Sequence, residues 1–276
     1  MTIKAGLIGC PLKRSLSPRI FALFSLRPGD KYSYTLLETR AAGLTRTLEN
    51  IKKNGWAGFN VTLPLKEKIL PLLDILSPET KAIGAVNAVR IKKGKFEGRN
   101  TDAAAVKLAL REAGFRPRGR TCVIWGAGGA ARAAAWVLGA SGAKAVIIHN
   151  RSSRRAAGLV KYFSALFPRT AFKALAFAAA PREGATLFVN ATPLGMYKQL
   201  PGDLRFSGGP GSFYLDFAYS RGVTPFLKNR TGITISGLDM LIYQALKSSE
   251  LFGGRRIRLC EIVKLKDRIK TGLNLK

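Results

Sequence analysis

The chain has 276 residues, of which 47% are hydrophobic and 9% aromatic, so it is long and apolar enough for one large or two smaller domains with buried cores and is not globally disordered. It carries 46 Lys and Arg against 16 Asp and Glu, a net charge of +30. Such a charge is compatible with nucleic-acid binding or with a surface that attracts small anions. The basic residues are spread along the whole chain without a zinc-finger, helix-turn-helix or RNA-recognition signature, so nucleic-acid binding is the weaker interpretation.

Membrane, secreted and metal-binding classes are also disfavoured. The longest uncharged run, 184–197, is too short to span a membrane as a helix. The chain begins Met-Thr-Ile-Lys and enters a strand-like run without a charged and then apolar leader, so we expect a cytoplasmic protein. The three cysteines are far apart and His149 is the one histidine, which predicts no metal site and fits a reducing compartment.

The first segment combines a strand with a hydroxyl-rich loop. Residues 4–8 are predicted to form a strand, followed by a loop and a helix from Arg19 to about Ser25. Ser17 stands before a proline and is expected to cap this helix, whereas Ser15 has nothing local to cap. Two hydroxyls so close together can bind a polyol or a carboxylate.

A strand at 32–37 and a helix at 41–54 lead to a second dense segment. Residues 59–63 are predicted to be a strand, and Pro64 to begin a helix that runs through Lys66 to about Leu76. In the first helical turn Lys66 would oppose the helix dipole. It is therefore either kept for chemistry or a solvated surface lysine.

Two further polar residues follow. Asn87 lies within a predicted strand at 83–91, where a buried amide must be hydrogen-bonded. Thr101 or Asp102 is expected to cap a helix that ends near Ala113. A basic linker at 114–120 then leads to the next strand.

The most informative stretch is a glycine turn between a strand at 122–125 and an Ala-rich helix that runs to Leu138. Gly126, Gly128 and Ala131 have the spacing of a dinucleotide-binding turn, in which small residues let the backbone approach a pyrophosphate at a helix N-terminus. The alternative is a tight strand–helix turn that binds nothing.

The end of the next predicted strand, 144–149, indicates which dinucleotide the turn would bind. An NAD site would be expected to place an acid there, but the chain has Arg151, Arg154 and Arg155. Arginine forks suit a 2′-phosphate. At about 1.5–3 kcal/mol for each charge-assisted bond, two such contacts favour NADP(H) over NAD(H) by roughly 100-fold or more. We interpret His149, at the strand end, as a packing or linker residue.

Later strands are expected at 185–190, 214–219 and 231–235, and the C-terminal helices begin at Gly237 and include a basic amphipathic segment at 264–270. Alternating strands and helices predict an α/β fold with a parallel, doubly wound sheet.

Together these segments resemble the shikimate dehydrogenase family along the full length of the chain. The first motifs that carry the resemblance are Gly-Cys-Pro-Leu-x-x-Ser-Leu-Ser-Pro at 9–18, Asn-Val-Thr-Leu-Pro-Leu-Lys at 60–66, Gly-Ala-Val-Asn at 84–87 and Asn-Thr-Asp at 100–102. The others are Gly-Ala-Gly-Gly-Ala-Ala-Arg at 126–132, Asn-Arg-Ser at 150–152, Asn-Ala-Thr-Pro-Leu-Gly-Met at 190–196 and Gly-x-x-Met-Leu-x-x-Gln-Ala at 237–245.

The resemblance implies an α/β substrate domain, 1–103 with 240–276, and a Rossmann-like NADP-binding domain, 104–239. It implies reversible reduction of 3-dehydroshikimate to shikimate by NADPH, a step toward chorismate and the aromatic amino acids. By the family pattern the catalytic pair is Lys66 and Asp102, which also contact the substrate. The other substrate-binding residues it implies are Ser15, Ser17, Thr62, Asn87, Tyr219 and Gln244. The cofactor-binding residues it implies are Gly126, Ala127, Gly128, Gly129, Ala130, Asn150, Arg151, Ser152, Arg155, Phe217 and Gly237.

Two departures from the family pattern stand out. Arg14 replaces the usual histidine before Ser15, and Ala103 replaces a glycine after Asp102. Neither removes a proposed catalytic group.

The alternatives that stay open are a quinate or quinate/shikimate dehydrogenase and, from another class, a nucleic-acid-binding protein on a dehydrogenase fold. We expect small-molecule partners, no metal and no membrane, and a monomer or homodimer.

Overall fold

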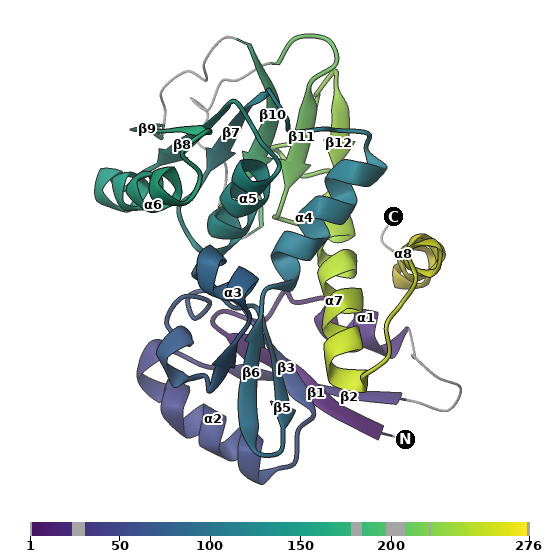
Figure 1. Ribbon diagram of the computed structural model, residues 1–276. Coiled ribbons are helices and arrows are strands. Elements are labelled where there is room, and N and C mark those ends of the chain that lie inside the picture. The colour runs from purple at the N-terminus through teal and green to yellow at the C-terminus, as the bar shows by residue number, and fades with distance from the viewer. Residues whose placement is uncertain (1, 24–30, 178–183, 197–207, 221, 275–276) are drawn as a thin grey trace. The chain divides into compact units, whose positions relative to one another are not determined.

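A computed structural model describes residues 2–23, 31–177, 184–196, 208–220 and 222–274 of the protein. The chain forms two compact units, each with its own six-stranded sheet (Figure 1). Unit 1 consists of residues 1–104 and 242–275, and unit 2 of residues 105–241. The boundaries predicted from the sequence, 103/104 and 239/240, compare with 104/105 and 241/242 here.

The sheet of unit 1 has the order β2-β1-β3-β5-β6-β4. The pairs β1–β2, β1–β3 and β4–β6 are parallel, whereas β3–β5 and β5–β6 are antiparallel, so this sheet is mixed rather than uniformly parallel. Its strands are β1 (Thr2–Gly9), β2 (Lys31–Glu38), β3 (Gly58–Val61), β4 (Ile75–Leu76), β5 (Ala88–Lys92) and β6 (Lys95–Arg99).

Helices cover both faces of this sheet. On one face, Leu48 and Ile51 of α2 pack against Phe59 of β3. On the other, Phe21 of α1 stacks on Tyr34 of β2, with ring centroids 4.2 Å apart. The helical segments of unit 1 are α1 (Ser17–Ala22), a 3-10 turn η1 (Ala41–Gly43), α2 (Leu44–Lys53), a 3-10 turn η2 (Leu70–Leu72), α3 (Pro78–Ile83) and α8 (Leu259–Leu273). Two longer helices, α4 (Thr101–Glu112) and α7 (Gly237–Gly253), run across the unit boundaries.

Unit 2 has an all-parallel sheet of order β12-β11-β10-β7-β8-β9. This order, with β7 in the interior and the chain running outward to each side, is the predicted doubly wound arrangement. The strands are β7 (Thr121–Trp125), β8 (Ala145–Asn150), β9 (Ala171–Ala176), β10 (Ala185–Asn190), β11 (Phe213–Asp216) and β12 (Ile233–Ile235). Helices α5 (Gly129–Ala140) and α6 (Ser153–Leu166) lie side by side against β7, β8 and β9 (Figure 1).

Several element predictions were wrong in detail. The helix predicted from Pro64 to about Leu76 does not form, and this segment is a series of turns with η2 and β4. Pro71 contributes to this, because a proline lacks the N–H that a helix interior needs. The strand predicted at 83–91 is the end of α3 followed by β5, and the predicted start of α1 at Arg19 moves to Ser17. Strands β6 and β9 were not predicted.

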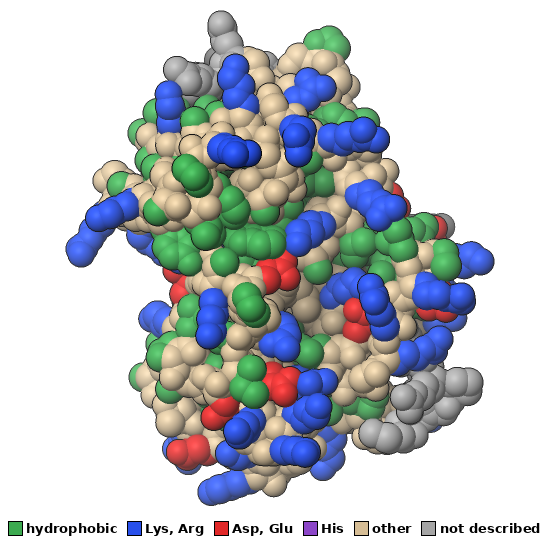
Figure 2. Space-filling view, viewed as in Figure 1, with side chains coloured by type: hydrophobic (Ala, Val, Ile, Leu, Met, Phe, Trp, Pro, Cys, Tyr) green, Lys and Arg blue, Asp and Glu red, His purple; other side chains and the backbone are tan. Residues whose placement is uncertain are grey.

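Basic side chains are scattered over the visible surface of both units, and acidic side chains are sparse (Figure 2). This matches the excess of Lys and Arg in the sequence. Among the described residues, no helix is both long enough and apolar enough to cross a membrane.

Candidate active site

Lys66 and Asp102, which are 36 residues apart in the chain, form an ion pair in unit 1. The distance from Lys66 Nζ to Asp102 Oδ2 is 2.6 Å, and the two side chains are 18% and 7% exposed. Lys66 lies in the turns after β3, so the argument from a helix dipole does not apply to it. Its main chain is held by Val86, whose N–H donates to Lys66 O over 2.8 Å.

Asp102 is the second residue of α4 and does not cap this helix. The cap is Asn100, whose Oδ1 accepts from the N–H of Ala103 at 2.9 Å. The expectation that Thr101 or Asp102 caps α4 was therefore wrong. Because Asn100 performs the capping, the Asp102 carboxylate is available to Lys66.

Asn87 orients the carboxylate of this pair. Its Nδ2 donates to Asp102 Oδ1 at 2.8 Å and to Thr101 Oγ1 at 2.9 Å, and its Oδ1 accepts from Thr101 N at 2.6 Å. Asn87 is 2% exposed and immediately precedes β5 rather than lying inside a strand. The expectation that its amide must be hydrogen-bonded is confirmed.

Gln244 of α7 reaches the same group of side chains. Its Oε1 lies 3.5 Å from the Nδ2 atoms of both Asn87 and Asn60. Asn60 Nδ2 also donates to Ser248 Oγ at 2.7 Å, and Tyr34 donates its hydroxyl to Asn60 Oδ1 at 2.9 Å. The sequence reasoning gave no role to Asn60, although it is a polar residue in an apolar strand, the same signal that drew attention to Asn87.

Of Ser15, Ser17 and Thr62, Ser17 was expected to cap α1, and this expectation was wrong. Ser17 is the first residue of α1 and makes no cap, and it is Ser15 whose Oγ accepts a hydrogen bond, from Ser17 N at 3.3 Å. Within the described residues, no hydrogen bond joins these three side chains to Lys66 or Asp102. Arg14 is exposed.

In unit 2 the glycine turn leaves its backbone accessible at the start of α5. Gly126 has a φ of +114°, and a Cβ there would lie 2.8 Å from Ala191 O, so a side chain is excluded. Gly128 is the N-cap of α5, and a Cβ there would meet only Arg155 Nη2, at 4.0 Å. Gly129 and Ala130 begin α5, and N–H groups in a first helical turn have no partner within the helix and can bind a phosphate.

An arginine of α6, which follows β8, reaches this turn. Ser152 caps α6 by accepting from Arg155 N at 3.3 Å, and Asn150 Nδ2 donates to Ser152 O at 3.0 Å. Arg155 Nη2 donates to Ala127 O of the glycine turn at 3.2 Å, and Arg151 is exposed. The glycine turn, the N-terminus of α5 and the nearby arginines together suit the binding of a phosphorylated dinucleotide.

The carboxyl ends of β10 and β11 are joined through a buried carboxylate. Asp216 Oδ1 accepts from Asn190 Nδ2 and from Ala218 N, both at 2.8 Å, and Thr224 Oγ1 donates to Oδ2 at 2.5 Å. Burial raises the pKa of Asp216 to about 7, although all three hydrogen bonds favour the ionised form. Sequence reasoning noted Asp216 only as a strand residue.

The remaining predicted residues of unit 2 lie close to this carboxylate in sequence. Phe217 donates its N–H to Asn190 O at 2.9 Å, and Tyr219 is half-buried two residues later. A Cβ at Gly237 would overlap Ala218 O, which explains the glycine at the start of α7.

His149 is fully buried and serves packing. It stacks on Trp125, with ring centroids 5.3 Å apart, and its Nδ1 lies 2.9 Å from Ala176 O. Burial lowers the pKa of His149, so the ring is neutral near pH 7.

A parallel doubly wound sheet with an open glycine turn, combined with a lysine–carboxylate pair in a second α/β unit, defines the class of nicotinamide-dependent oxidoreductases. Comparisons with known proteins narrow this class. Residues 7–89 match the family model of the shikimate dehydrogenase substrate-binding domain. A shikimate dehydrogenase (NADP(+)) of Moorella thermoacetica is 36% identical over 261 residues, which cover 91% of this chain and 88% of that protein.

Solved structures agree with these sequence matches. Shikimate 5-dehydrogenase from Thermus thermophilus, in complex with NADP(H) and shikimate, is 33% identical with a TM-score of 0.79, covering 97% of this chain and 99% of that one. A ligand-free 5-ketofructose reductase of a Gluconobacter strain is 27% identical with a TM-score of 0.79, covering 98% and 99%. The chain belongs to the shikimate dehydrogenase family.

Proposed function

We propose that the protein catalyses the NADPH-dependent, reversible reduction of 3-dehydroshikimate to shikimate, a step in the synthesis of aromatic amino acids. Membership of the family supports this activity, as do relatives named for NADP(+) and a structural neighbour that holds both NADP(H) and shikimate. The observation that carries the proposal within this chain is the Lys66–Asp102 ion pair, at 2.6 Å, with Asn87 and Gln244 beside it.

The pair suits a step in which charge develops on oxygen. NADPH, when bound, supplies the hydride that reduces the ketone carbon. Lys66 Nζ donates a proton to the resulting oxygen or stabilises its negative charge, and in the reverse direction it accepts the proton from the hydroxyl. Asp102 keeps the ammonium in place, since its Oδ2 accepts from Nζ while its Oδ1 is occupied by Asn87.

The substrate carries hydroxyls and a carboxylate, which need several polar partners. We assign these contacts to Ser15, Ser17, Thr62, Asn87, Gln244 and Tyr219. Asn87 and Gln244 have the strongest support, because both belong to the hydrogen-bonded group around Asp102. Ser17 is the first residue of α1, and the half-buried Ser15 lies two residues before it and accepts a hydrogen bond from Ser17 N.

For the cofactor, the N–H groups at the start of α5 bind the pyrophosphate and Arg151 binds the 2′-phosphate. Asn150 and Ser152 fix the loop that carries Arg151, and Arg155 braces the glycine turn through Ala127 O. The main chain of Phe217 and Gly237 borders the nicotinamide. No acidic residue follows β8 to bind a ribose 2′-hydroxyl, which supports the choice of NADP(H).

A steady-state assay with purified protein tests the activity. Shikimate with NADP(+) should give the highest kcat/KM, and quinate, or NAD(+) in place of NADP(+), should each lower it at least about tenfold. 5-Ketofructose with NADPH serves as a further arm, because one structural neighbour is a 5-ketofructose reductase. Equal rates with shikimate and quinate would support a quinate/shikimate dehydrogenase instead.

We place the enzyme in a reducing compartment, the cytoplasm, because Cys10, Cys122 and Cys260 are all free thiols. We also propose that it acts as a monomer or homodimer without nucleic acid. Light scattering gives the oligomeric state directly, and a gel-shift assay at physiological salt tests nucleic-acid binding.

A further inference from the structure

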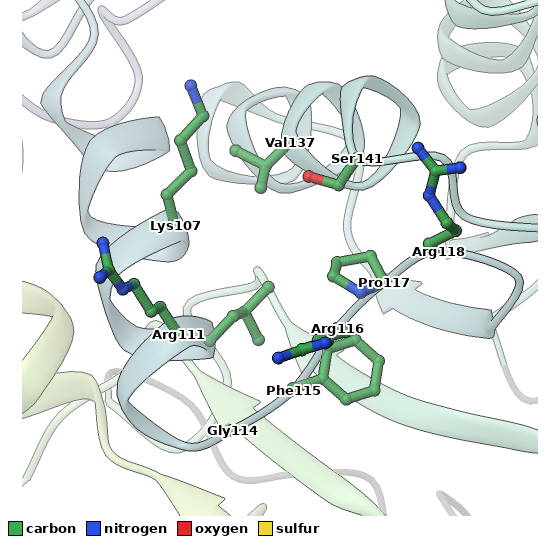
Figure 3. Close-up of a pocket in the computed structure, with 10 residues that line it drawn as sticks. Lys107, Arg111, Gly114, Phe115, Arg116, Pro117, Arg118, Val137 and Ser141 are labelled. Atoms are coloured by element: carbon green, nitrogen blue, oxygen red, sulfur yellow. The ribbon is translucent and has the colours of Figure 1, made fainter.

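A cavity lies in unit 2 near the start of β7, at the opposite end of this strand from the glycine turn. It is lined by the end of α4, by the linker at 114–118 and by the last turns of α5, and it measures about 440 Å³ (Figure 3). The linker precedes the first residue of β7, whereas the glycine turn follows the last residue of β7. The two sites therefore lie at opposite ends of β7, and the length of this strand, about 13 Å, separates the cavity from the glycine turn.

The rim of the cavity is strongly basic. Lys107 and Arg111 contribute from α4, and Arg116 and Arg118 from the linker. The ten lining residues include no aspartate or glutamate, and among the described residues no acidic group forms an ion pair with any of the three arginines. The C-terminal ends of α4 and α5 each contribute about half a negative charge, which four cations outweigh. The site therefore attracts anions.

The interior of the cavity is apolar rather than charged. Leu110, Phe115 and Val137 line it and are 2%, 6% and 1% exposed. Pro117 lies between the rim arginines, and Ser141 directs its hydroxyl into the space from the end of α5 (Figure 3). A volume of about 440 Å³ is within the usual size range of small-molecule sites, which are mainly apolar with a few polar groups that fix orientation.

We propose that this cavity is a second ligand site, which binds a small phosphate monoester that carries an apolar ring. The ring lies against the apolar wall, and the dianionic phosphate is bound by arginine forks of the rim, which match its geometry. An anion without a ring would use the arginines alone, and a ring without a charge would use only the apolar wall. This site is independent of the proposed activity, because its residues take no part in the Lys66–Asp102 group or the glycine turn.

Calorimetric titration with phenyl phosphate tests the proposal, since this probe combines one ring with one phosphate. Inorganic phosphate and phenol are the partial probes and should each bind at least about tenfold more weakly. The double variant Arg111→Gln/Arg116→Gln should weaken phenyl phosphate binding at least about tenfold. Arg120→Gln is the matched control, because Arg120 is an exposed arginine of the same linker that does not line the cavity, and it should change the affinity less than about twofold.

The location of the bound probe is read from amide NMR shifts of the full-length protein. Shifts at Gly114, Ser141 and Gly142 support the proposal. Shifts confined to Gly126 and Gly128 mean that the probe occupies the cofactor turn, and they overturn it. Absence of phenyl phosphate binding also overturns the proposal, as does equal binding by the double variant and the control. If phenyl phosphate fails to bind, and a single-stranded oligonucleotide binds the wild type and the control but not the double variant, the proposal is likewise overturned. None of these readouts needs turnover, so failure of the assigned activity is distinguishable from failure of this site.

Discussion

Asp102→Asn is the sharpest test of the lysine–carboxylate pair, because it keeps the shape of the side chain and removes its charge. Both carboxylate oxygens are used by donors: Lys66 Nζ on Oδ2 at 2.6 Å and Asn87 Nδ2 on Oδ1 at 2.8 Å. An amide has one accepting oxygen, so its NH2 group must face one of these donors. The variant therefore loses one charge-assisted hydrogen bond and gains a donor–donor contact.

The loss of one hydrogen bond to a charged group is worth about 1.5–3 kcal/mol. At 1.4 kcal/mol for each factor of ten, kcat/KM for shikimate should fall roughly 10- to 150-fold. The matched control is Glu97→Gln, since Glu97 Oε2 also lies 2.6 Å from a cation, Arg90 Nη2, and its side chain is 11% exposed against 7% for Asp102. Steady-state kinetics and urea unfolding of both variants separate activity from stability. If Asp102→Asn kept kcat/KM within about threefold of the wild-type value, or if Glu97→Gln lowered it equally, the assigned role of the pair would be wrong.

Three further predictions concern the two units separately. Lys66→Ala should lower kcat at least about 100-fold, the low end for a general acid or base, whereas the exposed neighbour Lys68, changed to Ala, should keep normal turnover. Arg151→Ala should raise KM for NADPH and leave KM for NADH nearly unchanged, and an equal rise for both cofactors would remove its 2′-phosphate role. The folded-state pKa of Asp216, about 7, is above the ordinary value of 3.8, so its contribution to stability is complete below about pH 3.8 and is lost as the pH rises through 7. Asp216→Asn, whose amide can donate to the Thr224 hydroxyl, should therefore gain stability relative to wild type between pH 5 and about pH 8 in urea unfolding, and a constant difference across that range would contradict the buried-carboxylate account.

The glycine turn and the doubly wound sheet could be predicted because their signals are local. The strand at 122–125, the spacing of Gly126 and Gly128 and the Ala-rich run that follows all belong to one continuous segment. Local propensity and tertiary structure agree there, and β7, α5 and β10 form close to their predicted positions.

The surroundings of Lys66 could not be predicted in the same way. The apolar spacing after Pro64 suits a helix, yet Leu65 and Ile69 are buried by turns that pack against β3 and α2. The cap of α4 was misassigned because Asn100, Thr101 and Asp102 are all good capping residues, and only the tertiary contacts of the last two decide between them. The ion pair itself joins residues from separate elements, so no local pattern contains it, and the family resemblance supplied it.

The division of the chain into units has a consequence for synthesis on the ribosome. Unit 2 is one continuous segment, 105–241, whereas unit 1 needs residues from both ends of the chain. Asn60 binds Ser248, Tyr32 donates its hydroxyl to Ser249 O, and Arg19 binds the carbonyl of Leu273. The N-terminal segment is therefore translated first but acquires these contacts last. At about 5–20 residues per second it waits roughly 10–50 seconds for its C-terminal helices, while unit 2 can already fold.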